Sequence, residues 1–437
     1  MSIDVIIADD SAYLRKSIAD ILKGHKLINI VDYAKNGEEA IKLIKKHNPD
    51  VLILDLLMPK MNGLDAFKMI MDECPTPTVI LSAISPKNLD SSIQALLMGA
   101  FDYIIKPGGI GAKDLPRFRE ELLGKVLLAS QSQIKRIFQK ENGDYENPKS
   151  LRQEIVSEIF DFGQYLNRLS PIQEVEEVQE IIDIGKTETA KKNQHTNLGK
   201  LEVKPTTKSS VRRSHKTKEL LPQKSRSFIQ KKKKSTYTPN LNPIKGVSLT
   251  SNIVVIGASV GGPRTITTIL KELPKNFPAP ILLVQHLSAQ FMSAFSDNLN
   301  LECNLKIKVA SNGEFIQPGV VYIAPGENHM EISVKDNKPC IKIYKGTPVN
   351  YCMPSIDILF YSAAKIYRNR AMGIILTGMG SDGVEGLGAI QKLGGKTISE
   401  SEETSILYAM PKLAAEKGFV GLILPNYEIK DQILKFK

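Results

Sequence analysis

Short apolar runs alternate with amphipathic stretches in the N-terminal part of the chain. Four runs rich in Val, Ile and Leu are predicted to be strands, at 5–8, 51–54, 78–81 and 103–105. Between the first two, residues 11–22 place apolar side chains at helical spacing and predict an amphipathic helix. Strands that alternate with helices in this way predict an α/β fold built on a doubly wound parallel sheet.

The same alternation resumes at about residue 249, and three of its predicted strands each lead to a polar residue. The strand 253–258 ends at Ser259, the strand 281–285 ends at His286, and a third strand runs into the turn that holds Asp382. In an open parallel sheet, functional groups gather at the carboxyl ends of the strands. Ser, His and Asp on one rim suit a nucleophile, a general base and its orienting acid, which favours a hydrolase.

Residues 126–248 follow neither pattern. Apolar residues recur every three or four positions over 151–169, which predicts an amphipathic helix. The coil after it is rich in Lys, Ser, Thr and Asn and poor in large apolar residues, so we expect it to be disordered. The pattern thus predicts a first domain over 1–125, a linker over 126–248 and a second doubly wound domain over 249–437.

The net charge of +11 comes from this linker. Residues 186–246 hold 17 Lys/Arg and 3 Asp/Glu, a net of +14, which leaves −3 for the rest of the chain. Such a segment could hold the protein at an anionic membrane surface, and a solvated spacer is the alternative. No base-reading or stacking element accompanies the charge, so no specific nucleic-acid partner is expected.

The composition also indicates which kinds of protein this chain does not resemble. No apolar run reaches the ~20 residues that a membrane span needs, and the first residues read as a strand and not as a signal segment. We therefore expect a cytoplasmic protein. The four cysteines are scattered and form no Cys-x-x-Cys pair, which argues against disulfides and structural zinc. They are Cys74, Cys303, Cys340 and Cys352.

Charged and hydroxyl side chains end the N-terminal strands as well. These are Asp9, Asp10, Asp55, Ser82 and Lys106. Carboxylates held together repel one another, and Mg²⁺ relieves that repulsion, while a carboxylate can also accept a phosphoryl group. Alternatively, Asp9 and Asp10 only cap the following helix, but that reading leaves the groups at the other strand ends unexplained.

The sequence around these residues resembles a response-regulator receiver domain over about residues 1–122. The matching segments are 7–11, 54–65, 81–83 and 101–107. The resemblance implies a flavodoxin-like fold, phosphorylation at Asp55, and a cis Lys106–Pro107 bond. It implies Mg²⁺ bound by Asp10, Asp55 and the Leu57 carbonyl, with Asp9 beside them. It also implies that Ser82 and Lys106 bind the phosphoryl group and that Tyr103 reorients on activation.

Ser259 lies in a glycine-rich segment that is typical of a sharp turn between a strand and a helix. Gly257, Ser259 and Gly261 fit the G-x-S-x-G pattern, which places a serine on a sharp turn before a helix whose N–H groups favour developing negative charge. The alternative is a phosphate-cradling turn. The segment lacks the G-x-G-x-x-G spacing, and His286 stands where a ribose-binding acid would be sought.

The order Ser, His, Asp differs from that of α/β-hydrolases, and the surrounding segments resemble the chemotaxis protein-glutamate methylesterases instead. They are 256–262, 284–286, 322–326, 329–330, 354–357 and 376–383. The resemblance covers 249–437 and implies a Rossmann-like domain without a cofactor. It implies Ser259 as nucleophile, His286 as base, Asp382 as its partner and the Met379 N–H in the oxyanion hole. Two departures from the family are Val260, in place of a threonine, and Tyr351–Cys352–Met353, where a basic residue is usual.

The resemblance also implies substrates and control. The substrates would be methylated glutamates of chemoreceptors, with some receptor glutamines deamidated, and a chemotaxis histidine kinase would donate the phosphoryl group. The unphosphorylated receiver would cover the catalytic rim, although a connection of about 120 residues could weaken that block. The alternative is a response regulator whose C-terminal half only binds a ligand or partner.

Overall fold

The computed structural model describes residues 2–83, 85–107, 115–141, 239, 241–242, 244 and 246–436. All of them belong to one compact unit, Met1–Ser170 with Ser235–Lys437. The predicted helix over 151–169 and nearly all of the basic stretch 186–246 lie outside the described residues. Within the described ranges, no helix combines the length and apolar character that a membrane span requires.

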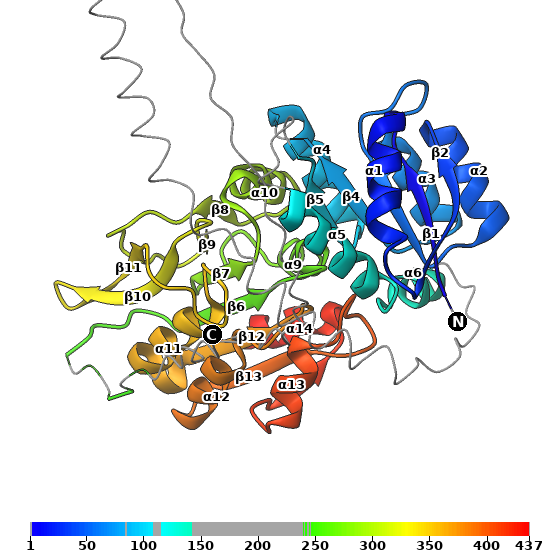
Figure 1. The fold of residues 1–437 in the computed structure, drawn as a ribbon. Helices are drawn as coiled ribbons and strands as arrows, with labels where there is room; N and C mark the ends of the chain where they lie inside the picture. The colour runs from blue at the N-terminus through cyan, green and yellow to red at the C-terminus, as the bar shows by residue number, and fades with distance from the viewer. Residues whose placement is uncertain are drawn as a thin grey trace, which may run out of the picture. The chain divides into compact units, whose positions relative to one another are not determined.

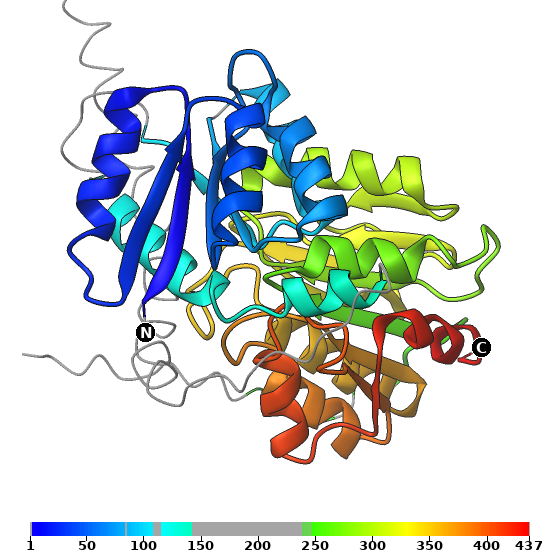
Figure 2. The same ribbon diagram turned by 90° about the vertical axis from the view of Figure 1, so that its right-hand side faces the viewer.

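The N-terminal domain is a five-stranded parallel sheet in the order β2-β1-β3-β4-β5 (Figures 1 and 2). Its strands are β1 (Ile3–Ala8), β2 (Ile28–Ala34), β3 (Val51–Asp55), β4 (Thr78–Ser82) and β5 (Asp102–Ile105). This is the expected flavodoxin-like order. The sequence prediction missed β2, because this edge strand is only partly buried and carries polar residues between its apolar ones.

Helices connect these strands, and side-chain caps mark several of their starts. They are α1 (Ala12–Leu22), α2 (Gly37–His47), α3 (Gly63–Glu73), α4 (Pro86–Met98) and α5 (Leu115–Ala129). Ser11, Asn36, Asn62 and Ser85 each accept a hydrogen bond from the backbone N–H three residues on, which satisfies a donor that the helix leaves free. A short helix, α6 (Ile134–Glu141), follows α5.

The C-terminal domain is a seven-stranded parallel sheet in the order β14-β13-β12-β6-β7-β9-β8. Its strands are β6 (Ile253–Ala258), β7 (Ile281–Gln285), β8 (Lys306–Val309), β9 (Val320–Ile323), β12 (Ala371–Ile375), β13 (Lys396–Glu400) and β14 (Leu422–Leu424). An antiparallel hairpin, β10 (His329–Lys335) and β11 (Lys338–Tyr344), forms a separate two-stranded sheet that the sequence prediction did not include. Strand β6 lies between β12 and β7, so the three strands that lead to Asp382, Ser259 and His286 are neighbours.

Both faces of the central strands β6, β7, β9 and β12 are buried, as their continuous apolar runs predict. Along β6, Val254 and Ile256 pack into one apolar core and Ile253 and Val255 into another. The helices are α9 (Gly262–Leu270), α10 (Ala289–Glu302), α11 (Ile356–Tyr367), α12 (Val384–Lys392), α13 (Met410–Glu416) and α14 (Asn426–Leu434). With two buried faces, the polar strand ends are left as the place for chemistry.

Candidate functional site

The strand ends of the N-terminal domain bring two buried carboxylates onto one lysine. Lys106 Nζ lies 2.8 Å from Asp9 Oδ2 and 2.7 Å from Asp55 Oδ2. Asp9 and Asp55 are almost fully buried, at 0% and 3% exposed. Asp10 is exposed, and its carboxylate oxygens come within 4.8 Å of those of Asp9 and Asp55. Three carboxylates so close together are a donor set that suits a hard divalent cation.

Burial sets the electrostatics of this cluster. Burial raises the pKa of Asp55, while the hydrogen bond and charge of Lys106 oppose the rise. Burial acts to lower the pKa of Lys106, but hydrogen bonds to Asp55 and Asp9 outweigh it and leave that pKa raised. The lysine therefore stays charged, and it compensates only part of the negative charge around it.

The other residues predicted for this rim are placed less directly. Leu57 donates its N–H to Asp55 Oδ1 at 3.1 Å. Ser82 Oγ accepts a hydrogen bond from Ser92 Oγ at 2.9 Å, and within the described ranges it has none to Asp55. The expected cis bond at Lys106–Pro107 was wrong, since the described residues hold a single cis peptide, at Met353–Pro354.

In the C-terminal domain, Ser259 sits on the tight turn between β6 and α9. Its N–H donates to Thr377 O at 3.1 Å, and its carbonyl accepts from Gln285 Nε2 at 2.8 Å. Gly261, at φ +76°, adopts the left-handed conformation that glycine tolerates. A Cβ on Gly378 would lie 2.6 Å from Ser259 Cβ, so only glycine lets the turn after β12 approach the serine this closely.

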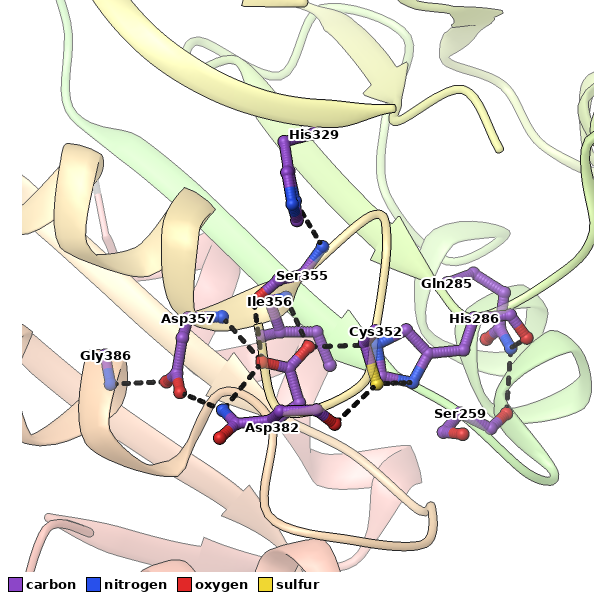
Figure 3. A network of polar contacts seen from close by, with 11 residues as sticks. Ser259, Gln285, His286, His329, Cys352, Ser355, Ile356, Asp357, Asp382 and Gly386 are labelled. Carbon is purple, nitrogen blue, oxygen red and sulfur yellow. Dashed lines mark hydrogen bonds and ion pairs between the residues drawn. The ribbon is translucent and has the colours of Figure 1, made fainter. Parts of the chain in front are cut away.

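His286 and Asp382 are brought together as predicted. His286 Nε2 lies 3.0 Å from Asp382 Oδ2 (Figure 3). The other ring nitrogen, Nδ1, lies 3.9 Å from Cys352 Sγ. Ser259 lines the same pocket as His286, but within the described part of the chain no hydrogen bond joins its hydroxyl to the imidazole. Because Nε2 is held by Asp382, Nδ1 is the nitrogen left for a reacting proton.

Asp382 is held by a loop that the sequence prediction did not assign to the site. The carboxylate is 1% exposed, and it accepts hydrogen bonds from Ser355 Oγ at 2.7 Å and from the N–H of Ile356 at 2.6 Å (Figure 3). Asn350 Nδ2 donates to it as well, at 3.3 Å. Asp357 N also lies within 3.3 Å. A carboxylate that accepts this many hydrogen bonds is fixed in orientation.

A second buried carboxyl group lies beside this one. Asp357 accepts hydrogen bonds from Gly386 N and Asn350 Nδ2, both at 2.7 Å, so Asn350 bridges the two aspartates. Burial and the charge of Asp382 raise the pKa of Asp357 to about 8. His329 supports the same loop, because its Nδ1 accepts the N–H of Ser355 at 3.2 Å and its Nε2 bonds Thr347 O at 3.0 Å. The sequence signal for Ser355 and Asp357 is the 354–357 segment, which takes part in the family resemblance but does not give a role to each residue.

The imidazole is tuned by opposing effects. Burial acts to lower the pKa of His286, but the neighbouring Cys352 and the hydrogen bond to Asp382 outweigh it and leave that pKa raised. Burial also raises the pKa of Cys352, so its side chain is a thiol near neutral pH and its charge adds nothing there. Near neutral pH, the hydrogen bond to Asp382 is therefore the effect that raises the pKa of His286.

The turn after β12 carries the predicted oxyanion donor. Thr377 N donates to Glu400 Oε2 at 2.8 Å, and Thr377 Oγ1 donates to Val260 O at 2.9 Å. Among the described residues, the N–H of Met379 has no hydrogen-bond partner. Glu400, which the sequence prediction missed, is fully buried, and burial raises its pKa to about 7.

The N-terminal domain contacts the rim that holds the histidine. Tyr103 Oη lies 3.2 Å from both Oγ and N of Ser288, two residues after His286, and its ring centroid is 4.1 Å from that of Phe291. A small pocket, open to solvent, is lined by Ser259 and His286 of the C-terminal domain and by Leu96 and Phe101 of the N-terminal domain. The two predicted sites are therefore joined through direct contacts.

Two family models match this chain. One is the response regulator receiver domain, over residues 5–113, and the other is the CheB methylesterase, over residues 254–433. The protein-glutamate methylesterase/protein-glutamine glutaminase of Caldanaerobacter subterraneus is 31% identical over 436 residues, which cover 99% of this chain and 96% of that protein. The protein of the same description from Archaeoglobus fulgidus is 31% identical over 432 residues, 99% of this chain and 97% of its own.

Solved structures match each half separately. The Thermotoga maritima CheB methylesterase catalytic domain is 38% identical, and the match covers 43% of this chain and all of that one, with a TM-score of 0.43. The response regulator domain of Thermotoga maritima CheB is 34% identical and covers 30% of this chain and 98% of that one, with a TM-score of 0.28.

Proposed function

Because this chain belongs to the family of protein-glutamate methylesterases/protein-glutamine glutaminases, we propose that it hydrolyses methyl esters of glutamate side chains in chemoreceptors and deamidates receptor glutamines. The observation that carries the proposal is the His286–Asp382 hydrogen bond at the strand ends beside Ser259. Both reactions are acyl transfers from a glutamyl side chain, so one serine site serves both.

The residues divide the chemistry as follows. Ser259 Oγ attacks the ester carbonyl carbon and gives its proton to Nδ1 of His286, since Nε2 is bonded to Asp382. The imidazolium returns that proton to the methoxy oxygen, and methanol leaves an acyl-serine. Water then attacks the acyl-serine while His286 accepts its proton, and the imidazolium gives that proton to Ser259 Oγ as glutamate is released. With glutamine the leaving group is ammonia.

The negative oxygen of each tetrahedral intermediate needs donors that are already in place. We assign this role to the N–H of Met379, which has no partner among the described residues, and to the N-terminus of α9. Glu400 supports the Met379 turn by accepting the N–H of Thr377. Asn350, Ser355 and Asp357 position Asp382, and through it the imidazole.

Control is proposed to come from the N-terminal domain. Asp55 would be phosphorylated by a chemotaxis histidine kinase, with Lys106 and Ser82 binding the phosphoryl oxygens. Mg²⁺ would be held by Asp10, Asp55 and the Leu57 carbonyl, with Asp9 beside them, and would neutralise charge during phosphoryl transfer. The cluster of carboxylates within 4.8 Å fits that ion.

Tyr103 offers a route from the phosphorylated site to the catalytic rim. Tyr103 belongs to β5, three residues before Lys106. Its hydroxyl is hydrogen-bonded to Ser288, which lies two residues after His286. New charge at Asp55 would change the hydrogen bonds of Lys106 and Ser82. Because Lys106 directly follows β5, the end of that strand would shift with it. Release of Tyr103 from Ser288 would then open the pocket that Leu96 and Phe101 cover.

The contacts of α6 bear on the long linker. The Gln133 N–H, just before α6, donates to Ile406 O at 3.1 Å, and Arg136 donates to Glu402 O at 2.6 Å. The Arg264 guanidinium lies 4.5 Å from the Phe138 ring centroid. These contacts hold the start of the connection on the C-terminal domain, so receiver control need not depend on the length of the remaining tether. The cytoplasmic location and a membrane contact through 186–246 stay predictions.

The test is methanol release from methylated chemoreceptor membranes. The unsubstituted protein is expected to release methanol, and Ser259→Ala is expected to lose nearly all of it, because the nucleophile is gone. Ser333→Ala, on the β10–β11 hairpin, is the matched control and should keep the rate. Equal release by Ser259→Ala and the control would overturn the assignment and favour a C-terminal half that only binds.

A further inference from the structure

One side chain at the catalytic rim has no part in the proposed reaction. Cys352 stands in the Tyr351–Cys352–Met353 segment, and its Sγ lies 3.9 Å from Nδ1 of His286 (Figure 3). The ligand atoms of His286, Cys352 and Asp382 all lie within 4.8 Å of one another. A thiol, an imidazole and a carboxylate together are the donor types that Zn²⁺ prefers.

The hydrogen bonds of the His286 ring determine which of its two nitrogens could bind such an ion. Asp382 occupies Nε2, so in the neutral imidazole Nδ1 is the nitrogen whose lone pair faces the sulfur. A histidine that binds zinc through one nitrogen and donates its other N–H to a carboxylate is the usual arrangement at zinc sites. Asp382 is itself held by Ser355 and Ile356, so it serves best as this outer partner.

The distance is close to what a shared ion requires. Bond lengths of about 2.0–2.1 Å to nitrogen and about 2.3 Å to sulfur place tetrahedral ligands roughly 3.5 Å apart. The observed 3.9 Å therefore needs a small inward shift of one side chain. Cys352 is presented by a closed turn, in which Val349 and Cys352 exchange backbone hydrogen bonds at 2.8 and 3.1 Å. Such a turn holds the sulfur on the histidine side before any ion arrives.

We propose that Nδ1 of His286 and Sγ of Cys352 bind Zn²⁺, and that the bound ion reversibly blocks hydrolysis at Ser259. Binding forms an Nδ1–Zn and an Sγ–Zn bond, and the thiol proton leaves to solvent. Water or the Ser259 hydroxyl completes the coordination in the shared pocket. The block follows because the metal occupies the lone pair that would accept the serine proton, and this part rests on the proposed function.

The site is distinct in chemistry from the carboxylate cluster of the N-terminal domain. Asp9, Asp10 and Asp55 offer only oxygen and suit Mg²⁺, whereas sulfur and imidazole select softer ions. Mg²⁺ in excess should therefore fill the carboxylate cluster and leave the Cys352 site to a thiophilic ion. This difference lets the two sites be separated in one sample of the full chain.

Binding is tested with Co²⁺ as a spectroscopic substitute for Zn²⁺, in the full-length protein with excess Mg²⁺. The expected signal is the ultraviolet thiolate-to-Co²⁺ charge-transfer band, which Zn²⁺ should remove. Cys352→Ala and Cys352→Ser should lack the band, and Cys303→Ala should keep it. No band in the unsubstituted protein, or a band retained in both Cys352 variants, would overturn the site whether or not the protein is an esterase.

Inhibition is tested separately by methanol release. Zn²⁺ should inhibit the unsubstituted protein and Cys303→Ala, and a chelator should restore the rate. The Zn²⁺ concentration for half inhibition should rise at least about tenfold in Cys352→Ala, in line with the loss of affinity when a metal site is disturbed. Unchanged sensitivity in that variant would refute inhibition through Cys352.

Discussion

The two functional rims of this protein use the same architecture and support their polar groups differently. In the N-terminal domain, Asp9, Asp55 and Lys106 leave three strand ends and contact one another directly. In the C-terminal domain, His286 and Asp382 also meet at strand ends, but the carboxylate is held by a loop some 30 residues earlier in the chain. Parallel sheets bring such groups to one edge. What the difference teaches is that the proposed phosphorylation site relies on one lysine between two carboxylates, whereas the proposed base has a partner that several hydrogen bonds fix.

The sharpest way to break this comparison is Asp382→Asn. An amide cannot accept all the hydrogen bonds that Asp382 accepts, and it no longer stabilises an imidazolium. We expect methanol release to fall about 10³–10⁴-fold, as in other Ser-His-Asp sites. We also expect a loss of about 1–3 kcal/mol in stability against urea, because buried donors are left unpaired. Asp336→Asn, in the β10–β11 turn at φ +51°, is the control. A fall of less than tenfold would show that the imidazole does not need the fixed carboxylate.

A second test concerns the buried carboxylate beneath the oxyanion turn. The pKa of Glu400 is raised from 4.5 to about 7, because burial disfavours its charged form. Between these values the folded protein holds a proton that the unfolded chain has released, so stability falls as pH rises through this window. The fall should reach up to ~3 kcal/mol.

Glu400→Gln should remove this contribution and leave the fall expected from Asp357, whose pKa is also raised by burial. Its amide oxygen can still accept from Thr377 N and its NH₂ can donate to Thr404. Urea-unfolding midpoints of the C-terminal domain between pH 4.5 and 8 check this, with Glu416→Gln on α13 as the control. The same decline with pH in Glu400→Gln and in the unsubstituted protein would contradict an ionisation at this residue.

The smallest expected effect belongs to the contact between the rims. Tyr103→Phe removes the hydroxyl that bonds Ser288 and keeps the ring that packs on Phe291. A hydrogen bond of about 1 kcal/mol corresponds to a change of roughly fivefold, so unstimulated methanol release should rise by up to that factor. Tyr33→Phe, on the edge strand β2, should leave the rate unchanged. A lower rate in Tyr103→Phe would mean that the contact supports catalysis and does not restrain it.

The sequence predicted the strand ends better than their surroundings. Ser259, His286, Asp55 and Lys106 follow apolar runs, and a parallel sheet gives such residues a defined place. Asn350 could not be found in this way, because it lies in a loop and its partner Asp382 is 32 residues away. Glu400 does end a strand, β13, but this strand is mostly polar and gives no continuous apolar run. The edge strand β2 was missed for a related reason, since a half-exposed strand has no continuous apolar run.

The pairing of nitrogens was also beyond the sequence. The strand pattern places His286 at the rim, but only the structure shows that Nε2 bonds Asp382 and that Nδ1 faces Cys352. That orientation decides which nitrogen can accept the serine proton, and it is what makes a metal site at Cys352 chemically reasonable.

The most direct measurement is stimulation of methanol release by a small-molecule phosphodonor with Mg²⁺, in the unsubstituted protein and in Asp55→Asn. The ratio of stimulated to unstimulated rate should exceed one in the unsubstituted protein and equal one in Asp55→Asn. A ratio below that of the unsubstituted protein is expected for Tyr103→Phe, whose restraint is already released. The same stimulation in Asp55→Asn as in the unsubstituted protein would contradict the claim that the carboxylate rim controls the serine rim.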